Sequence, residues 1–545
     1  QLSEAEKPVV FDRFECPPEA PSKYNNPHNS HYVSDETSIT VTNSTPIFTL
    51  EKRKVKKGLP LVNVKPERIL RIGVFFDGTG QNNRNDAYKE DHGDKSRSNI
   101  ARLFEAYPQK LGESDAIYVS GVGTLDNAWQ TPSIIDKGDD ETPLSGGTGL
   151  FDKNGAYAKW RTLLDQLERI ITALQLKGEY DSITHIAFDV FGFSRGAALA
   201  RHFVNALKMG LPDYTQLRGR DKSTVFPNLL APTDSSSNYT KDYGYKADTA
   251  RTASVRFIGL FDTVGSFDMP GDDDNSEFQL YLNPKDVGRA FQICAHHEYR
   301  INFPLTSLKT KGKLPPNFYE EVFPGAHTDV GGGYPFVEQY HKTDLPERYG
   351  TPTQSTYNRE LVKVWSLEER RKDYTYRGGI SDFNEMLRSE QASHQLEWND
   401  TCQAQYGQKG LVALENNTLY FYRLQPIDAS LAGLSQERMK QQAELFGVEW
   451  IKSRYNTSKD YENNSVQKSL WDKLAALPLG KISPQDWLPD IPDNCIHRSH
   501  DSVINPGCSD LIDSQVNGIA NLDAFKRYQP NTPLNIPTRE IYDNE

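Results

Sequence analysis

The sequence predicts an α/β fold of the α/β-hydrolase type: a mostly parallel sheet flanked by helices, with an inserted, mainly helical region. Two observations support this prediction. Strand-like and amphipathic helical segments alternate over residues 66–340, and this order builds a parallel sheet. Residues 192–196 then form a G-x-S-x-G motif between a buried strand and a helix. In that setting such a sheet carries a reactive serine.

The expected strands are short apolar runs, and each leads into a glycine or into a side chain capable of chemistry. They cover 69–76, 116–120, 183–191, 255–261 and 319–323, and the residues that follow them are Asp77, Gly121, Ser194, Asp262 and His327. The carboxyl ends of parallel strands meet at one edge of a sheet. We therefore expect these residues to converge there.

Helices are expected between these strands. They cover 98–107, 156–176, 197–209 and 284–303. Ser98-Asn99-Ile100 opens the first, and apolar side chains recur at helical spacing in the second. Two segments, 126–155 and 212–252, are polar and rich in turn residues, so we expect loops or insertions there.

The rest of the chain is expected to form three parts. Residues 1–65 lack periodicity and predict an irregular arm. Its basic cluster at 52–57 either contacts lipid phosphates or an acidic partner, or is simply solvated. Residues 341–490 predict a mainly helical insert or cap, and residues 491–545 a segment that returns to the catalytic domain. The insert is expected to hold helices at 358–371, 435–446 and 464–477 and a hairpin at 411–424.

Composition argues against several classes of protein. The net charge of −12 argues against nucleic acid as a partner. No apolar run approaches the roughly 18 residues that would indicate a membrane-spanning helix. Residues 1–7 lack the basic and apolar regions of a signal peptide. The five cysteines are scattered and odd in number, so a reducing cytoplasm is expected as the place of synthesis.

The G-x-S-x-G motif predicts a nucleophile at a sharp strand-to-helix turn. Gly192 and Gly196 let neighbouring backbone pass close to Ser194. The helix that follows directs its positive end at the place where an oxyanion would form. The alternative is a glycine-rich turn with an inert serine.

A serine needs a base, and the base needs an acceptor on its other ring nitrogen. Ser194, Asp262 and His327 supply the three groups in the order expected for this type of sheet. The alternative for His327 is a structural loop histidine. Asp329 lies too near His327 in sequence to be the first choice of acid, and Asp77 is assigned to the oxyanion side.

The oxyanion donors are expected in two places. One is the backbone N–H of Arg195, and the other lies in the glycine-rich loop at Gly78 and Thr79. A phosphate-binding loop is the alternative for 77–83, but no G-K-[ST] follows.

Neither a metal nor another cofactor is expected. The sequence His296-His297-Glu298 is not the H-E-x-x-H zinc motif. A second set of possible zinc ligands is Cys495, His497, His500 and Cys508. Their spacing matches no common zinc site.

Four ordered segments, 75–79, 192–197, 261–264 and 325–334, resemble the bacterial type VI secretion lipase effectors of the G-x-S-x-G-bearing first family. A weaker element is His500-Asp501-Ser502. The resemblance covers roughly 69–335, and 340–490 corresponds to the variable part of the family.

The resemblance implies a phospholipase that is delivered into rival bacteria and attacks membrane phospholipids from the periplasm. By resemblance, Ser194 is the nucleophile, Asp262 the orienting acid and His327 the base. It also implies a spike (VgrG-type) carrier and a cognate immunity protein, and secretion without a signal peptide. Two alternatives stay open: an esterase acting on soluble esters, and an inactive hydrolase-like scaffold that binds secretion partners.

Overall fold

The structure is a computed structural model, and it describes thirteen parts of the chain. They are residues 37–41, 48–52, 68–92, 96–124, 155–208, 211, 252–265, 278–300, 302–335, 357–367, 380–415, 417–499 and 538–545. Several expectations lie wholly or largely outside them: the arm at 1–65, its basic cluster, the segments 126–155 and 212–252, and His500-Asp501-Ser502. Within the arm, β1 (Thr37–Val41) and β2 (Phe48–Lys52) pair antiparallel.

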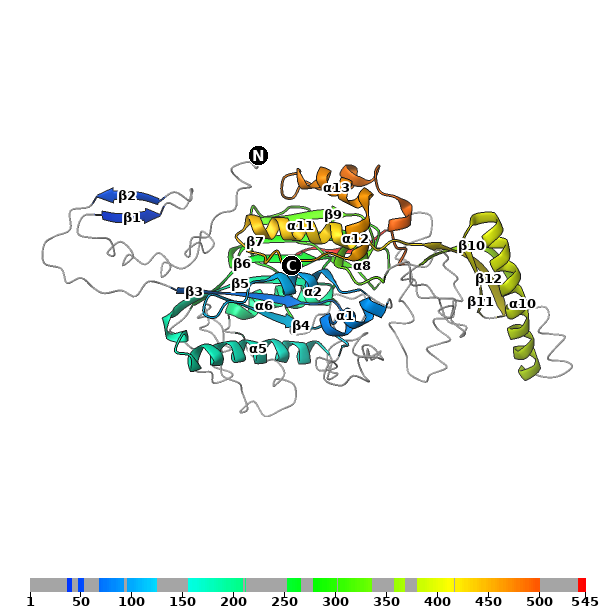
Figure 1. Ribbon diagram of the computed structural model, residues 1–545, viewed down its shortest axis with the longest axis horizontal. Helices are drawn as coiled ribbons and strands as arrows, with labels where there is room; N and C mark the ends of the chain where they lie inside the picture. Colours follow the sequence, from blue (N-terminus) through cyan, green and yellow to red (C-terminus); the bar gives the residue numbers. More distant parts are fainter. Residues whose placement is uncertain are drawn as a thin grey trace.

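A six-stranded parallel sheet forms the body of the molecule, in the order β4-β3-β5-β6-β7-β9 (Figure 1). The predicted α/β fold class is therefore confirmed. The strands are β3 (Arg68–Phe76), β4 (Ser114–Val119), β5 (Ile183–Phe193), β6 (Thr252–Phe261), β7 (Val287–Ala295) and β9 (Phe318–Phe323).

The strand order places a topological switch beside β3. The chain leaves β3 to form β4 on one side and returns to form β5 on the other. Ligands of open α/β sheets bind beyond the carboxyl ends of the strands at such a point. The loop after β3 and the turn after β5 both lie there, so the topology brings Asp77 close to Ser194.

The two faces of the sheet bury different side chains because strand residues alternate between them. One face, with Ile72, Phe188 and Ile258, packs against α5 (Ala156–Leu176) and α6 (Arg195–Lys208). The other face is rich in phenylalanine, including Phe75 and Phe191. It packs against α2 (Asn99–Ala106) and α11 (Leu431–Leu445). Helices thus cover both faces (Figure 1).

The last described residues return to the sheet edge that carries the predicted site. β13 (Ile541–Tyr542) pairs parallel with β8 (Leu305–Thr306). The N–H of Thr306 in turn donates to the carbonyl of Thr263, 2.9 Å away. This carbonyl is one residue beyond Asp262, so the C-terminal strand is tied to the end of β6.

A second, smaller sheet extends away from the body (Figure 1). It is antiparallel in the order β10-β12-β11 and carries α10 (Ile380–Tyr406) on one face. Its strands are β10 (Tyr357–Ser366), β11 (Lys409–Glu415) and β12 (Thr418–Pro426). The predicted hairpin at 411–424 corresponds to β11 and β12 and is confirmed.

Two predictions of helices are wrong, because the structure has strands in both segments. Residues 284–303 contain β7, a central strand buried on both faces, and such a strand lacks the alternation that would distinguish it from a buried helix. Residues 358–371 contain β10. There Leu361, Val364 and Trp365 imitate helical spacing, and a bulge between Leu361 and Lys363 interrupts the strand periodicity.

The remaining helices are short or lie outside the sheet's two layers. The expected helices at 435–446 and 464–477 correspond to α11 and α13 (Ser465–Ala475). The others are α1 (Asn83–His92), α8 (His327–Gly331), α12 (Lys459–Asn463) and α14 (Pro484–Trp487). A search of the described residues finds no helix with the length and hydropathy needed to cross a membrane.

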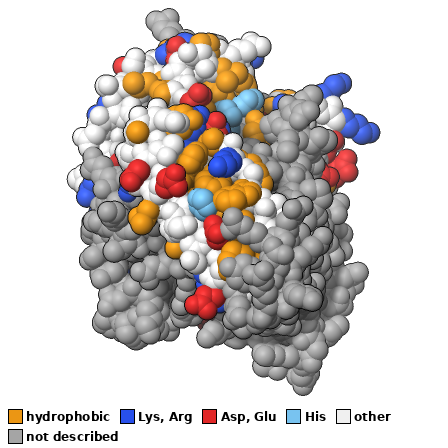
Figure 2. All heavy atoms as spheres, turned by 90° about the vertical axis from the view of Figure 1, so that its right-hand side faces the viewer, with side chains coloured by type: hydrophobic (Ala, Val, Ile, Leu, Met, Phe, Trp, Pro, Cys, Tyr) orange, Lys and Arg blue, Asp and Glu red, His pale blue; other side chains and the backbone are white. Residues whose placement is uncertain are grey.

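Figure 2 shows the end of the molecule that carries the small sheet. Acidic, basic and hydrophobic side chains are intermixed on the described part of this surface.

A buried ion pair fastens α11 to the sheet. Arg438 donates from Nε and Nη2 to the carboxylate of Glu321 in β9, and both side chains are fully buried. Arg438 also donates to the carbonyl of Leu477. A bidentate pair of this kind fixes the geometry of two elements, and removal of one partner leaves a buried charge uncompensated.

We predict that Arg438→Ala lowers the free energy of unfolding by about 3–5 kcal/mol, because Glu321 would be left buried without its counter-charge. The double variant Arg438→Met, Glu321→Leu should recover most of this loss. Denaturant midpoints of the three proteins measure both effects. A double variant as unstable as the single one would contradict the assignment.

Candidate active site

Ser194 lies on the sharp turn that the motif predicts. Its φ of 59° is in the left-handed region, and α6 begins at the next residue. Gly192 and Gly196 are required by packing. A Cβ on Gly196 would lie 2.2 Å from the carbonyl oxygen of Asp77, and one on Gly192 would lie 2.6 Å from Cα of Ala197. The turn is therefore strained and closely packed, as a nucleophile elbow requires.

The glycine-rich loop after β3 lies directly against this turn. Nε of Arg195 donates to Oγ1 of Thr79, 2.8 Å away. The carboxylate of Asp77, which is buried, accepts from the N–H of Gly78 at 2.8 Å and from the hydroxyl of Ser98 at 2.6 Å. Asp77 thus shapes the loop from within, and the N–H of Gly78 already has a partner.

Gly121, at the end of β4, supports the same loop from behind. Its N–H donates to the carbonyl of Gln81 at 2.7 Å. A Cβ at this position would lie 1.8 Å from the carbonyl oxygen of Gly78. Only glycine permits this approach, so the turn between β4 and the next segment fixes the loop after β3.

Backbone hydrogen bonds tie Ser194 to both sides of Asp262. The N–H of Ser194 donates to the carbonyl of Phe261 at 3.2 Å, and the N–H of Val264 donates to the carbonyl of Ser194 at 3.3 Å. Asp262 itself has a φ of 46°. The strained turns after β5 and β6 are therefore joined at their tips.

Asp262 and His327 form a buried pair. Nδ1 of His327 lies 2.5 Å from Oδ2 of Asp262, and the residues are 3% and 0% exposed respectively. Burial alone would raise the pKa of Asp262, but the charge of Arg539 and the hydrogen bond from His327 hold it well below its usual range. Because an ionised carboxylate only accepts, Nδ1 carries the proton.

The second ring nitrogen of His327 is then left as an acceptor. Nε2 is buried and has no hydrogen-bond partner among the described residues, so it is not bonded to Ser194. Contacts of this kind are often long in the absence of substrate. Burial lowers the pKa of His327, while the hydrogen bond and charge of Asp262 oppose that shift. The ring is therefore neutral near pH 7 and able to take a proton.

Two aromatic rings enclose the imidazole. The rings of Phe193 and His327 are 4.7 Å apart between centroids, and the ring of Phe303 meets that of His327 edge-on at 5.1 Å. A Cβ on Gly331 or Gly78 would collide with the ring of Phe193. These glycines therefore leave the space in which the ring of Phe193 packs against the imidazole of His327.

Sequence reasoning missed two charged groups beside this pair. Arg539 donates from Nη1 and Nη2 to the two carboxylate oxygens of Asp262, at 2.7 and 2.8 Å. Glu298, fully buried, accepts from the backbone N–H of His327 at 3.1 Å. Burial alone would raise the pKa of Glu298, but Arg300 lowers it to about 2. No sequence signal marks either residue, since neither belongs to a motif.

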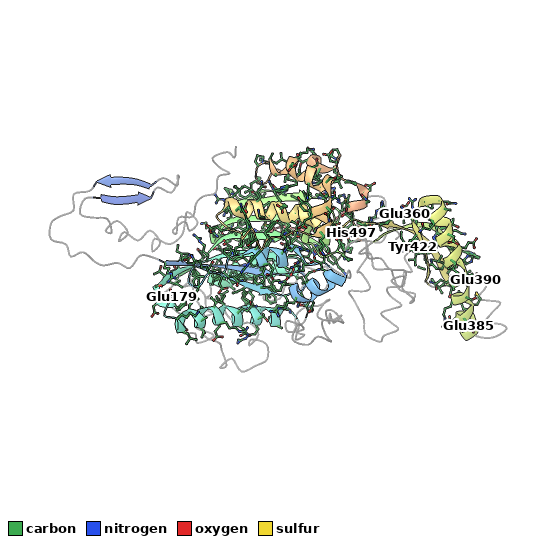
Figure 3. All side chains as sticks on the ribbon, viewed as in Figure 1. Glu179, Glu360, Glu385, Glu390, Tyr422 and His497 are labelled. Atoms are coloured by element: carbon green, nitrogen blue, oxygen red, sulfur yellow. The ribbon has the colours of Figure 1, made fainter. Side chains whose placement is uncertain are left out.

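Asp329, the alternative acid, is engaged elsewhere. Its Oδ1 lies 2.6 Å from Nδ1 of His497, and both side chains are fully buried. The ring of Tyr334 stacks on that of His497 at 3.7 Å. Figure 3 places His497 where β10 joins the body. Asp329 therefore fastens α8 to the C-terminal segment and is not the partner of His327.

The zinc alternatives gain no support within the described residues. No group of three or more histidine, cysteine, aspartate or glutamate side chains there could hold a metal ion. His500 and Cys508 lie outside those residues. The side chain of His497 is instead committed to Asp329.

The arrangement can carry out acyl transfer. A serine on a strained turn, a neutral imidazole with one free buried nitrogen and an ionised carboxylate are the three groups of a nucleophilic triad. A helix N-terminus and a glycine-rich loop flank the serine, where negative charge would develop on a carbonyl oxygen.

Comparison with known proteins identifies a phospholipase family. Residues 71–349, just over half of the chain, match the family model of the Tle1-like phospholipase effectors of the type VI secretion system, catalytic domain. No curated protein gives a significant match.

Two solved structures are similar to the chain. One is the Tle1 effector bound to the VgrG spike of the type VI secretion system. It is 22% identical with a TM-score of 0.43, over 93% of this chain and 99% of that chain. The other is an uncharacterised protein from Pseudomonas aeruginosa, 23% identical with a TM-score of 0.31, over 50% of this chain and 42% of that one.

We predict that Gly196→Ala slows labelling of Ser194 by a fluorophosphonate probe at least about tenfold, since the added methyl would push the elbow away from the backbone of Asp77 and Phe76. Gly312→Ala is the control for a strained glycine substitution away from the elbow, because its φ is 73° while a Cβ there meets nothing within 4 Å. Mass spectrometry of the labelled protein measures both rates. Equal labelling of the two variants would contradict the packing argument.

Proposed function

Since this chain belongs to the Tle1-like phospholipase effectors of the type VI secretion system, we propose that it hydrolyses fatty-acyl esters of membrane phospholipids with Ser194 as nucleophile. His327 is the base and Asp262 the orienting acid. The observation that carries this proposal is the buried contact between His327 and Asp262, held against the strained turn of Ser194.

The reaction begins with proton transfer. Nε2 of His327 takes the hydroxyl proton of Ser194 as the oxygen attacks the ester carbonyl. The imidazolium that forms is stabilised by the ionised Asp262. His327 then returns the proton to the leaving alcohol, which departs as a lysophospholipid. Water, activated by the same nitrogen, cleaves the acyl-enzyme and releases the fatty acid.

The oxyanion of each tetrahedral intermediate is held by backbone donors. We assign them to the N–H of Arg195, at the start of α6, and to the N–H of Thr79 in the loop after β3. The N–H of Gly78 is the weaker candidate, because it already donates to Asp77. The bond from the Arg195 side chain to Thr79 supports this assignment, since it holds the two donors' segments together.

Membership of a type VI secretion family supports three further proposals about the setting of the reaction. The protein acts as an antibacterial toxin at the membrane of a target cell, from the periplasmic side. A VgrG-type spike protein carries it there. A cognate immunity protein protects the cells that produce it.

We predict that Ser194→Ala lowers phospholipid hydrolysis about 10⁴-fold or more while the fold stays intact. Mass spectrometry of lipid products from vesicles, with circular dichroism as the check on folding, measures this. Ser435→Ala is a matched control, because Ser435 is a buried serine on α11 whose hydroxyl has no partner among the described residues. It should retain wild-type activity.

The same assay separates the alternatives. A lipase should act faster on vesicles than on short soluble esters, whereas an esterase would show the reverse. An inactive scaffold would cleave neither and would resist a fluorophosphonate probe. A fully active Ser194→Ala variant would refute the nucleophile.

We also predict that the acid limb of kcat/KM lies below the ordinary histidine pKa of about 6.5. Protonation of His327 removes the base, so the rate falls as pH drops through its pKa, which burial lowers. Initial rates on vesicles of fixed composition, measured over a pH series, locate this limb. A midpoint above the ordinary value would contradict a buried neutral base.

A further inference from the structure

We propose that Arg539 is a positioning residue of this site: its guanidinium holds the carboxylate of Asp262 and so sets the orientation and protonation of His327. The inference rests on the proposed function, because it concerns the same catalytic pair. Arg539 does not contact Ser194; it holds the carboxylate of Asp262 directly, and its charge also acts on the imidazole of His327.

The contact geometry is that of a two-pronged clamp. Nη1 and Nη2 each donate to a different oxygen of Asp262, at 2.7 and 2.8 Å, and Nε donates to the carbonyl of Phe303 at 2.8 Å. The planar guanidinium is thereby fixed at three corners. The remaining bond to Oδ1 of Asp262 comes from the N–H of Ala295 at 2.9 Å. The carboxylate has little freedom to rotate away from His327.

Strand pairing delivers this arginine to the site. The carbonyl of Glu540 accepts from the N–H of Leu305 at 3.0 Å, and the carbonyl of Tyr542 accepts from the N–H of Ser307 at 2.9 Å. Asn544 anchors the end, since its Oδ1 accepts from Nη2 of Arg201 at 2.9 Å. A slip of one residue in this pairing would turn Arg539 to the opposite side.

The charges around His327 show what the clamp does. Asp262 at the end of β6, Glu298 after β7 and Arg539 from the C-terminal segment all act on the imidazole. Two other charged side chains lie nearby, Arg300 and Asp329. Arg300 is paired with Glu298, and Asp329 on α8 is paired with His497. Within the part of the chain that the structure describes, Arg539 is thus the cation in direct contact with the carboxylate of this pair.

The sign of its effect follows from Coulomb's law. A guanidinium close to the ring disfavours the imidazolium and therefore lowers the pKa of His327, against the opposite effects of Asp262 and Glu298. Removing the positive charge should raise the pKa of His327. The base would then be protonated, and inactive, at a higher pH.

The test is the pH dependence of Ser194 labelling by a fluorophosphonate in the full-length chain. In Arg539→Gln the acid limb should move to higher pH by about one unit. Arg539→Lys keeps the positive charge but loses the two-pronged contact with the carboxylate. The acid limb of its pH profile should therefore stay near that of the wild type, while labelling of Ser194 slows about tenfold. If Arg539 had a purely structural role, Arg539→Gln would lower the melting temperature but leave the acid limb of the pH profile unchanged.

Arg256→Gln is the matched control. Arg256 also clamps a buried carboxylate through two nitrogens, at 2.8 and 2.6 Å from the oxygens of Asp189. It makes no contact with His327. An unmoved limb in Arg539→Gln, or an equal shift in Arg256→Gln, overturns the proposal. Should Arg539→Gln fail to fold, Arg539→Lys decides: slower labelling supports the clamp, and wild-type labelling overturns it.

Labelling needs no lipid, so the two proposals fail separately. A wild-type protein that is labelled at Ser194 but leaves phospholipids intact would overturn the proposed substrate and still report on Arg539. A wild-type protein that the probe does not label would overturn both.

Discussion

The carboxylate of Asp262 is the group on which the site depends. It is fully buried, and hydrogen bonds from Arg539, His327 and the N–H of Ala295 stabilise its ionised form against the effect of burial. An isolated carboxylate at this depth would take up a proton and lose its hold on the imidazole. The orientation of His327 therefore follows from the charge balance around Asp262 as much as from the path of the chain.

The parallel sheet supplies the frame for that balance. Neighbouring strands β5, β6 and β7 bring the turn of Ser194, Asp262 and the backbone of Ala295 to one edge. The switch beside β3 adds the glycine-rich loop. Close backbone approaches at Gly196 and Gly121 then lock the turn and the loop together at separations that a side chain would not permit. The strand order therefore determines which residues lie together at this edge, and the glycines allow their backbones to approach closely.

Much of this frame could be predicted from the sequence because its signals are local. The strand, turn and helix around Ser194 are contiguous, and Asp262 directly follows an apolar strand. Where local patterns were ambiguous, the prediction was wrong: β7 is buried on both faces, and the bulge in β10 breaks its alternation. Arg539 could not be found at all, since it lies 277 residues from Asp262 and meets it only through the pairing of β13 with β8.

The same long separations bear on how the site forms. Asp329 and His497 are 168 residues apart, and their contact fastens the short helix α8, whose His327 also meets Asp262, the partner of Arg539. Closing such long loops costs conformational entropy before any contact stabilises them. A helix as short as α8 has little stability of its own. The observed orientation of His327 therefore depends on contacts with residues far away in the sequence, in the C-terminal segments.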